Sequence, residues 1–134
     1  MDGPSLQVTS VTITTPDPRA LAAFYSRLLG RPVTTSEGPR QGHPPEDGWA
    51  QIRPVEGTAE PTLNFEYEEQ WKAPVWPAEA DGQNATQHLD IYVSDLEAAT
   101  SHALDAGATL ADVQPQETVR VLFDPDGHPF CIFV

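Results

Sequence analysis

The sequence has little basic charge, few sulfur-containing residues and no long apolar run. Its 134 residues hold seven Lys and Arg against 20 Asp and Glu, which gives a net charge of −13 at pH 7. Such a chain repels the phosphates of nucleic acids and anionic membrane surfaces, so we expect neither as a partner. No apolar segment approaches the length that a bilayer span requires, so we expect no membrane-spanning segment.

The single cysteine, Cys131, excludes an internal disulfide framework. The first residues show neither the basic region nor the apolar region of a signal peptide. Together these absences predict a reducing, cytoplasmic location. The length is that of one domain with a sizeable hydrophobic core.

Two segments that start 78 positions apart, at Ser10 and His88, carry the same pattern. In each, an alternating strand ends at an aspartate, Asp17 or Asp95, and a helical stretch follows. An aspartate at this place suits a helix N-cap, because its carboxylate accepts hydrogen bonds from amides of the first helical turn. A twofold internal repeat of this length indicates two halves of one fold and not a solenoid.

Helical spacing of apolar residues predicts helices over Pro18–Leu29 and Leu96–Ala106. Gly30 and Gly107 follow these stretches, where a left-handed C-cap favours glycine. The apolar stripes expected to face the core are Leu21, Phe24, Leu28 and Leu29 in the first helix and Leu96, Ala99, Ala103 and Leu104 in the second.

Alternating or short apolar segments predict eight strands, four on either side of a connection rich in proline and tryptophan. Each half therefore reads βαβββ, which predicts an α+β fold built from paired modules. We expect a single domain over residues 1–134, with module one at 5–68, the connection at 69–86 and module two at 87–134. The sequence leaves open which residues of 69–86 form a lid or an interface. The expected strands are Gln7–Thr14, Pro32–Ser36, Trp49–Arg53, Thr62–Glu68, His88–Val93, Thr109–Val113, Thr118–Phe123 and Pro129–Val134.

Strand alternation sorts the side chains into an apolar face, which packs on the helices, and an opposite face that mixes polar, charged and aromatic groups. The second face predicts a ligand pocket; a dimer interface or a solvated sheet surface is the alternative reading. Aromatic walls with two carboxylates favour neutral or cationic aromatic compounds over anions. The residues expected to bind the ligand are Trp49, Asn64, Glu66, His88, Asp90 and Tyr92.

Three phrases carry a resemblance to a known superfamily. They are Phe24-Tyr25 followed by Leu28-Leu29-Gly30, the segment His88–Asp95, and Phe123-Asp-Pro-Asp-Gly-His-Pro-Phe130. They resemble the vicinal oxygen chelate superfamily, which includes glyoxalase I, extradiol dioxygenases and bleomycin- and fosfomycin-resistance proteins. The resemblance implies the glyoxalase/bleomycin resistance/dihydroxybiphenyl dioxygenase-like fold and a homodimer.

In metal-using members, a divalent ion is held by residues on the first strand of each module and on a last strand. The resemblance places His88 at the second-module histidine, but Ser10 occupies the matching place in module one. The acidic position falls at Asn64 or, with a two-residue slip, at Glu66, and Cys131 replaces the last-strand glutamate. We therefore expect no complete metal site and no cofactor; if a metal binds, its ligands would be His88, Glu66 and Cys131.

Two functions stay open on this evidence. The first is a small-molecule-binding protein of the bleomycin-resistance style, and the alternative is a metal-dependent lyase, isomerase or dioxygenase of the glyoxalase I type that uses His88 and Glu66. The sequence does not decide whether the protein is an enzyme or which residues would be catalytic. Trp71 and Trp76 in the connection suit a dimer interface or a lid. His128, beside the turn Asp124–Gly127, is expected to be exposed.

Overall fold

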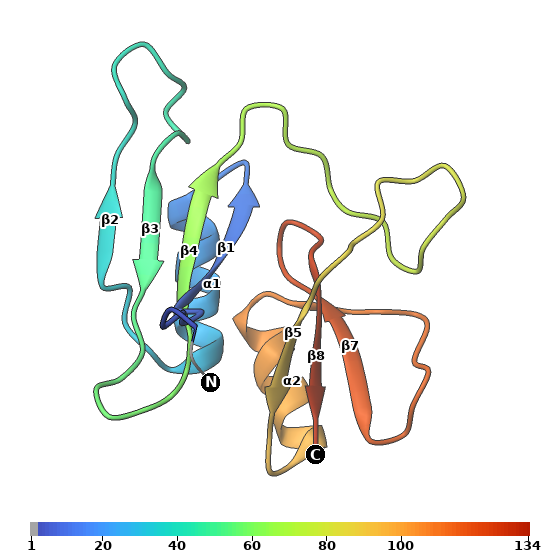
Figure 1. Ribbon diagram of the computed structural model, residues 1–134. Coiled ribbons are helices and arrows are strands. Elements are labelled where there is room, and N and C mark those ends of the chain that lie inside the picture. Colours follow the sequence, from blue (N-terminus) through green and yellow to red (C-terminus); the bar gives the residue numbers. More distant parts are fainter. Residues whose placement is uncertain (1–2) are drawn as a thin grey trace. The chain divides into compact units, whose positions relative to one another are not determined.

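The chain folds into two compact units that have the same order of elements. The structure, a computed structural model, describes residues 3–134 (Figure 1). Unit 1 comprises residues up to 26 together with 30–68, and unit 2 comprises 27–29 and 69–134. The predicted α+β class and the repeated βαβββ order are both confirmed.

The sheet of unit 1 has the strand order β1-β4-β3-β2. Its first and last strands pair in parallel, and the other neighbours pair antiparallel. The helix α1 (Pro18–Leu29) follows β1 and lies against one face of the sheet (Figure 1). The strands are β1 (Ser10–Thr15), β2 (Thr35–Glu37), β3 (Trp49–Ile52) and β4 (Thr62–Tyr67).

The sheet of unit 2 repeats this plan with the order β5-β8-β7-β6. Here too the first strand pairs in parallel with the last, and α2 (Leu96–Ala106) follows the first strand. The strands are β5 (Leu89–Tyr92), β6 (Thr109–Leu110), β7 (Val119–Phe123) and β8 (Pro129–Phe133).

All eight strands are shorter than predicted, by one to three residues, and for two of them the reason is identifiable. The strand expected over Gln7–Thr14 begins only at Ser10, because its partner β4 begins opposite at Thr62. The strand expected over Thr109–Val113 ends at Leu110. Beyond it, the Ala111 amide makes one more backbone bond, to the Val121 carbonyl, and the Gln114 side chain then donates to the Ala111 and Val121 carbonyls and accepts from the Val121 amide.

Both predicted N-caps are confirmed. The Asp17 carboxylate accepts from the amide of Ala20 at 3.2 Å, and the Asp95 carboxylate accepts from that of Ala98 at 3.0 Å. These bonds satisfy amides of the first turn that have no partner inside the helix. Gly30 ends α1 with φ of 66°, the left-handed conformation that glycine adopts without steric cost.

Strand alternation places the core of unit 1 as predicted. Ala50, Ile52, Leu63 and Phe65 are buried, while their neighbours along β3 and β4 are partly exposed. From α1, Tyr25 stacks on Phe65 with 5.6 Å between ring centroids. The helix therefore covers the apolar face of the sheet and leaves the other face to polar side chains.

The helix of unit 2 contributes fewer and smaller buried side chains to its core than the helix of unit 1 does. Phe130 and Ile132 of β8 are buried, as predicted, but α2 buries only Ala103 and Ala106. Leu104, expected in the apolar stripe, is 41% exposed. The prediction for Leu104 is wrong because Ala103 and Ala106 are three positions apart and share one helix face, so the buried stripe runs along these alanines and Leu104 points outward.

The connection between the modules belongs to unit 2. Trp71 lies 5.8 Å from His128 and Trp76 lies 6.2 Å from Phe123, measured between ring centroids. Both tryptophans are half-buried. They therefore pack on their own unit, which reduces the apolar surface that we expected them to offer to a partner.

The loop after β2 is fixed by a buried carboxylate. Asp47 is fully buried and accepts three hydrogen bonds from Arg40, one from its backbone amide and two from its guanidinium. Arg19 of α1 donates to the backbone carbonyls of Glu37, Pro45 and Asp47. The hydrogen bonds from the Arg40 side chain and backbone hold the pKa of Asp47 well below its usual value, against the opposing effect of burial.

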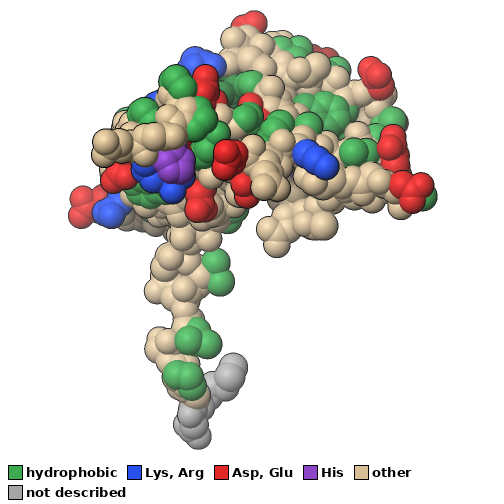
Figure 2. All heavy atoms as spheres, turned by 90° about the horizontal axis from the view of Figure 1, so that it is seen from above, with side chains coloured by type: hydrophobic (Ala, Val, Ile, Leu, Met, Phe, Trp, Pro, Cys, Tyr) green, Lys and Arg blue, Asp and Glu red, His purple; other side chains and the backbone are tan. Residues whose placement is uncertain are grey.

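Among the charged side chains on the visible surface, the acidic ones predominate (Figure 2). In Figure 2, Asp and Glu side chains spread over the face shown and exceed the Lys and Arg side chains, as the net charge of −13 requires. Within residues 3–134, neither helix combines the length and the apolar character needed to cross a bilayer.

Replacing the N-cap Asp95 by alanine is expected to lower the free energy of unfolding by about 1 kcal/mol, the usual cost of losing such a cap. Urea unfolding followed by circular dichroism measures the change. The control is Asp105→Ala, which removes an exposed carboxylate from the last turn of α2, where the helix dipole disfavours it. Equal destabilisation by both variants would contradict the capping role.

Asp47→Asn is expected to lower the melting temperature at pH 7. The difference in melting temperature between the wild-type protein and the variant should become smaller as the pH falls. The folded-state pKa is depressed, so the stabilisation is complete above the unfolded-state value of about 3.9. It is lost as the pH falls from there toward the folded pKa. Thermal melts between pH 7 and pH 3 test this, with the exposed Asp112→Asn as control. A deficit independent of pH would contradict it.

Candidate functional site

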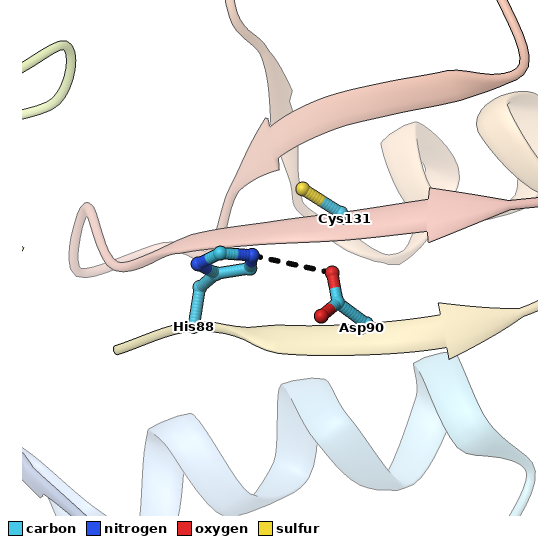
Figure 3. Close-up of side chains that lie close together, drawn as sticks. All are labelled: His88, Asp90 and Cys131. Atoms are coloured by element: carbon cyan, nitrogen blue, oxygen red, sulfur yellow. Dashed lines mark ion pairs between the residues drawn. The ribbon is translucent and has the colours of Figure 1, made fainter. Parts of the chain in front are cut away.

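Three side chains of unit 2 with metal-binding or acid–base chemistry converge on one face of its sheet. His88 directly precedes β5, and Asp90 follows two positions later, so both point to the same face. The parallel register of β5 and β8 sets Asp90 beside Cys131. Figure 3 shows the three side chains projecting from these adjacent strands toward one another.

The geometry of this His88–Asp90–Cys131 cluster is compact. The His88 Nε2 lies 3.2 Å from the Asp90 Oδ1. One potential ligand atom from each residue lies within 4.8 Å of the other two. The side chains of His88 and Asp90 are 48% and 59% exposed, so the cluster is open to solvent on one side.

Cys131 is a protonated thiol in this setting. Burial raises its pKa, and the negative charge of Asp90 and a hydrogen bond to it act in the same direction. A thiol is a poor nucleophile compared with its thiolate. The arrangement therefore does not favour a nucleophilic cysteine paired with the His88 imidazole.

A pocket of about 190 Å³ adjoins the cluster within unit 2. Its walls come from the connection, the segment before β7, and the strands β7 and β8. Most of the lining is apolar, and the His88 ring, the Gln116 amide and the Cys131 thiol are its polar groups. The lining residues are Trp76, His88, Pro115, Gln116, Val119, Val121, Pro129 and Cys131.

Of the six predicted ligand-binding residues, the pocket contains His88. Asp90 lies beside it through the ion pair with His88. Tyr92 is on the same face of β5 but 71% exposed, and its ring contacts Phe133 at 5.8 Å between centroids. The structure thus groups His88 with Asp90 and places Tyr92 further along the strand.

The other three predicted residues lie together on the outer face of the sheet in unit 1. Trp49 and Glu66 are register partners on β3 and β4. Asn64 accepts a hydrogen bond from the Gln51 side chain at 2.9 Å. Their place opposite the core agrees with the predicted alternation, and their part in ligand binding stays a prediction.

Two arginines in or near the strands, Arg53 and Arg120, form hydrogen bonds away from the predicted carboxylates. Arg53 donates to the Gln51 side chain at 3.1 Å. Arg120 donates to the backbone carbonyls of Glu117 and Val119. None of these hydrogen bonds involves Glu66 or Asp90.

Sequence reasoning missed most of the pocket wall. Val121 and Val119 of β7 lie opposite Cys131 and Phe133 of β8 in the antiparallel register. Extending the alternation rule from β8 to β7 would have placed both valines on the pocket face. No sequence signal placed Trp76 there, because its position depends on how the connection folds back.

The prediction that His128 is exposed is wrong. Its ring nitrogen Nδ1 lies 2.8 and 2.9 Å from the two carboxylate oxygens of Asp124, and its side chain is 19% exposed. Asp124 is buried and also accepts from the backbone amides of Asp126 and His128. The turn before β8 is therefore an internally bonded unit that fixes the start of that strand.

Comparison with known proteins agrees with the observed fold. Residues 10–133, nearly the whole chain, match the family described as Glyoxalase-like domain. No curated protein matches the chain significantly.

Solved structures with the same fold are only distantly related in sequence. A glyoxalase family protein from Enterococcus faecalis is 19% identical, with a TM-score of 0.67 over 96% of this chain and 97% of that one. A glyoxalase/bleomycin resistance protein/dioxygenase family enzyme from Burkholderia phytofirmans is 20% identical, with a TM-score of 0.61 over 95% and 97%.

A third similar structure contains a metal. A variant of the fosfomycin resistance protein FosX from Listeria monocytogenes, in complex with Mn(II) and a dihydroxypropylphosphonic acid, is 12% identical. Its TM-score is 0.68, over 95% of this chain and 90% of that one. The extent of the family match, together with the paired βαβββ units, shows that this chain belongs to the glyoxalase-like domain family of the vicinal oxygen chelate superfamily.

Proposed function

We propose that the protein binds a small neutral or cationic aromatic compound in the pocket of unit 2, in the style of a bleomycin-resistance protein. The observation that carries this proposal is the pocket itself, with the indole of Trp76 and the imidazole of His88 among apolar walls. Flat rings stack on such groups. A volume of about 190 Å³ suits one aromatic ring, either alone or as part of a larger molecule.

The charge around the pocket supports the preference for neutral or cationic compounds. Its lining contains neither Lys nor Arg, and the Asp90 carboxylate lies 3.2 Å from the His88 ring at its edge. An anion in the pocket would meet this carboxylate in a partly desolvated setting, where repulsion exceeds that in water. The net charge of −13 acts in the same direction over longer distances.

The second candidate is a metal-dependent lyase, isomerase or dioxygenase of the glyoxalase I type. The observation that favours it is the convergence of His88, Asp90 and Cys131. Its expected ligand Glu66 belongs to unit 1, whereas His88 and Cys131 belong to unit 2. Binding a compound without catalysing a reaction requires fewer functional groups than metal-dependent catalysis, so it remains the first proposal.

A homodimer and a cytoplasmic location are also part of the proposal. The free Cys131 is compatible with a reducing compartment. For the dimer, unit 2 offers apolar side chains that are largely exposed. Tyr92 is 71%, Val113 49% and Leu110 41% exposed.

We expect benzylamine and benzyl alcohol to raise the melting temperature and benzoate to leave it unchanged. The three share one ring and differ in charge. At a free concentration ten times its dissociation constant, a ligand stabilises the native state by about 1.4 kcal/mol. The measurement is a thermal-shift titration in the presence of chelator, so that a metal plays no part. Stabilisation by benzoate alone would overturn the charge preference.

Variants locate the binding in the same assay. Val119→Phe is expected to fill the pocket and abolish the shift, whereas Val113→Phe places the same ring on an exposed position outside it. Trp49→Ala and Glu66→Ala test whether the polar face of unit 1 contributes. A shift that survives Val119→Phe would show that the ligand binds elsewhere.

Sedimentation velocity at micromolar concentration is expected to show a dimer, because burial of exposed apolar side chains against a second copy stabilises the dimer. Tyr92→Asp should shift the population toward monomer, since it replaces an exposed ring by a charge in both copies. A monomeric wild-type protein would remove this part of the proposal.

A further inference from the structure

The pocket of unit 2 has three polar groups in its lining, and two of them already interact with Asp90. The His88 Nε2 lies 3.2 Å from the Asp90 carboxylate, and the Cys131 thiol forms a hydrogen bond with the same residue. The third group is the side-chain amide of Gln116, in the segment before β7. Within residues 3–134, that amide makes no hydrogen bond. A ligand in the pocket can therefore pair with Gln116 without displacing another protein group.

The nearby Gln114 shows what a structural glutamine does in this segment. Its side chain donates to the carbonyls of Ala111 and Val121 and accepts from the Val121 amide, each at 2.9 Å. All three bonds are to the backbone, so this side chain anchors the segment to β7. Gln116, two positions further on, has the same donor and acceptor groups but directs none of them to the backbone of the described residues, and it lines the pocket.

The backbone around Gln116 is held on both sides. Gln114 anchors the residues that precede it. After it, the Arg120 Nη1 donates to the carbonyls of Glu117 at 3.0 Å and Val119 at 2.9 Å. A segment whose backbone is already ordered loses less conformational entropy when a ligand binds to it. Binding at Gln116 therefore requires little ordering beyond that of its own side chain.

The amide of Gln116 also selects the kind of group that a ligand presents to it. A glutamine side chain offers two N–H donors and a carbonyl acceptor side by side. A carboxamide carries the complementary acceptor and donor, so two amides can form two hydrogen bonds at once. A carboxylate lacks the donor and is repelled by the nearby charge of Asp90, and an ammonium group lacks the acceptor.

We propose that the pocket of unit 2 takes neutral aromatic compounds that carry a carboxamide, and that Gln116 is the residue that selects them. This inference rests on the proposed aromatic binding and narrows it. Trp76 and His88 would stack on the ring, and Gln116 would pair with the amide. In small-molecule pockets the apolar walls supply most of the contact, and a few placed polar groups fix the orientation and the specificity.

Benzamide and acetophenone test the amide pairing, because they share the ring and the carbonyl and differ in an amino against a methyl group. With chelator present, we expect calorimetric titration to show benzamide binding about three- to tenfold more tightly, the usual effect of one hydrogen bond. Gln116→Leu should make the two dissociation constants equal. Glu117→Ala, at an exposed neighbour outside the lining, should preserve the difference. Equal affinities in the wild-type protein, or a preference that survives Gln116→Leu, would overturn the proposal.

A change of charge at the same position provides a second readout. Gln116→Glu replaces the donor by a second acceptor, which suits benzamidinium, a cation with donors only. The ratio of the benzamide to the benzamidine dissociation constant should rise by roughly tenfold, because charge-assisted hydrogen bonds are stronger than neutral ones. Thr118→Glu adds the same charge outside the lining and controls for long-range attraction. An equal rise in both variants would contradict the role of Gln116.

The failure of this inference is distinguishable from the failure of aromatic binding. If benzamide and acetophenone bind equally well and Val119→Phe blocks both, aromatic binding stands and the role of Gln116 is wrong. If neither compound binds to the wild-type protein, the aromatic pocket is wrong and selection by Gln116 is wrong with it. Circular dichroism and cooperative urea unfolding establish that each variant is folded.

Discussion

The parallel pairing of first and last strand in each unit is the constraint on which the rest of the structure depends. A parallel neighbour cannot be reached by a tight turn, so a helix must return the chain across the sheet. The helix packs on one face of the sheet, so that face becomes part of the hydrophobic core. The other face of β5 and β8 is thereby left to His88, Asp90 and Cys131.

The same pairing brings residues of distant sequence position into contact range. Asp90 and Cys131 are 41 positions apart, yet they are register partners, and the antiparallel β7 adds Val121 on the far side of Cys131. A shift of this register by one residue would turn every side chain of β8 to the opposite face. The internally bonded turn of Asp124 and His128 fixes where β8 begins and so protects the register.

The replacement of expected ligands changes the chemistry that this family's fold can support here. A serine at Ser10 and a cysteine at Cys131 remove two hard donors, and the pocket wall beside Cys131 is largely apolar. The local environment keeps the thiol protonated through burial and the charge of Asp90. A protonated thiol is a poor metal ligand, so this environment disfavours the metal chemistry implied by the superfamily.

Much of the fold could be predicted because its signals are local. The aspartate caps, the glycine ends and the period of two along the strands act within a few residues, and they placed both helices at their observed bounds. The face carrying His88 and Asp90 followed from the same period. The Glyoxalase-like family match covers residues 10–133, which include the three phrases that carry the resemblance.

The sequence by itself thus determined the repeated βαβββ order and which side chains share a face, because these depend on spacing along one chain. Only the tertiary structure decided that Asp90 lies beside Cys131, that Trp76 folds onto Phe123 and the pocket, and that His128 is held by Asp124. Those contacts depend on strand register and on the path of the connection. Both are set by the sum of many packing contacts, which no short segment encodes.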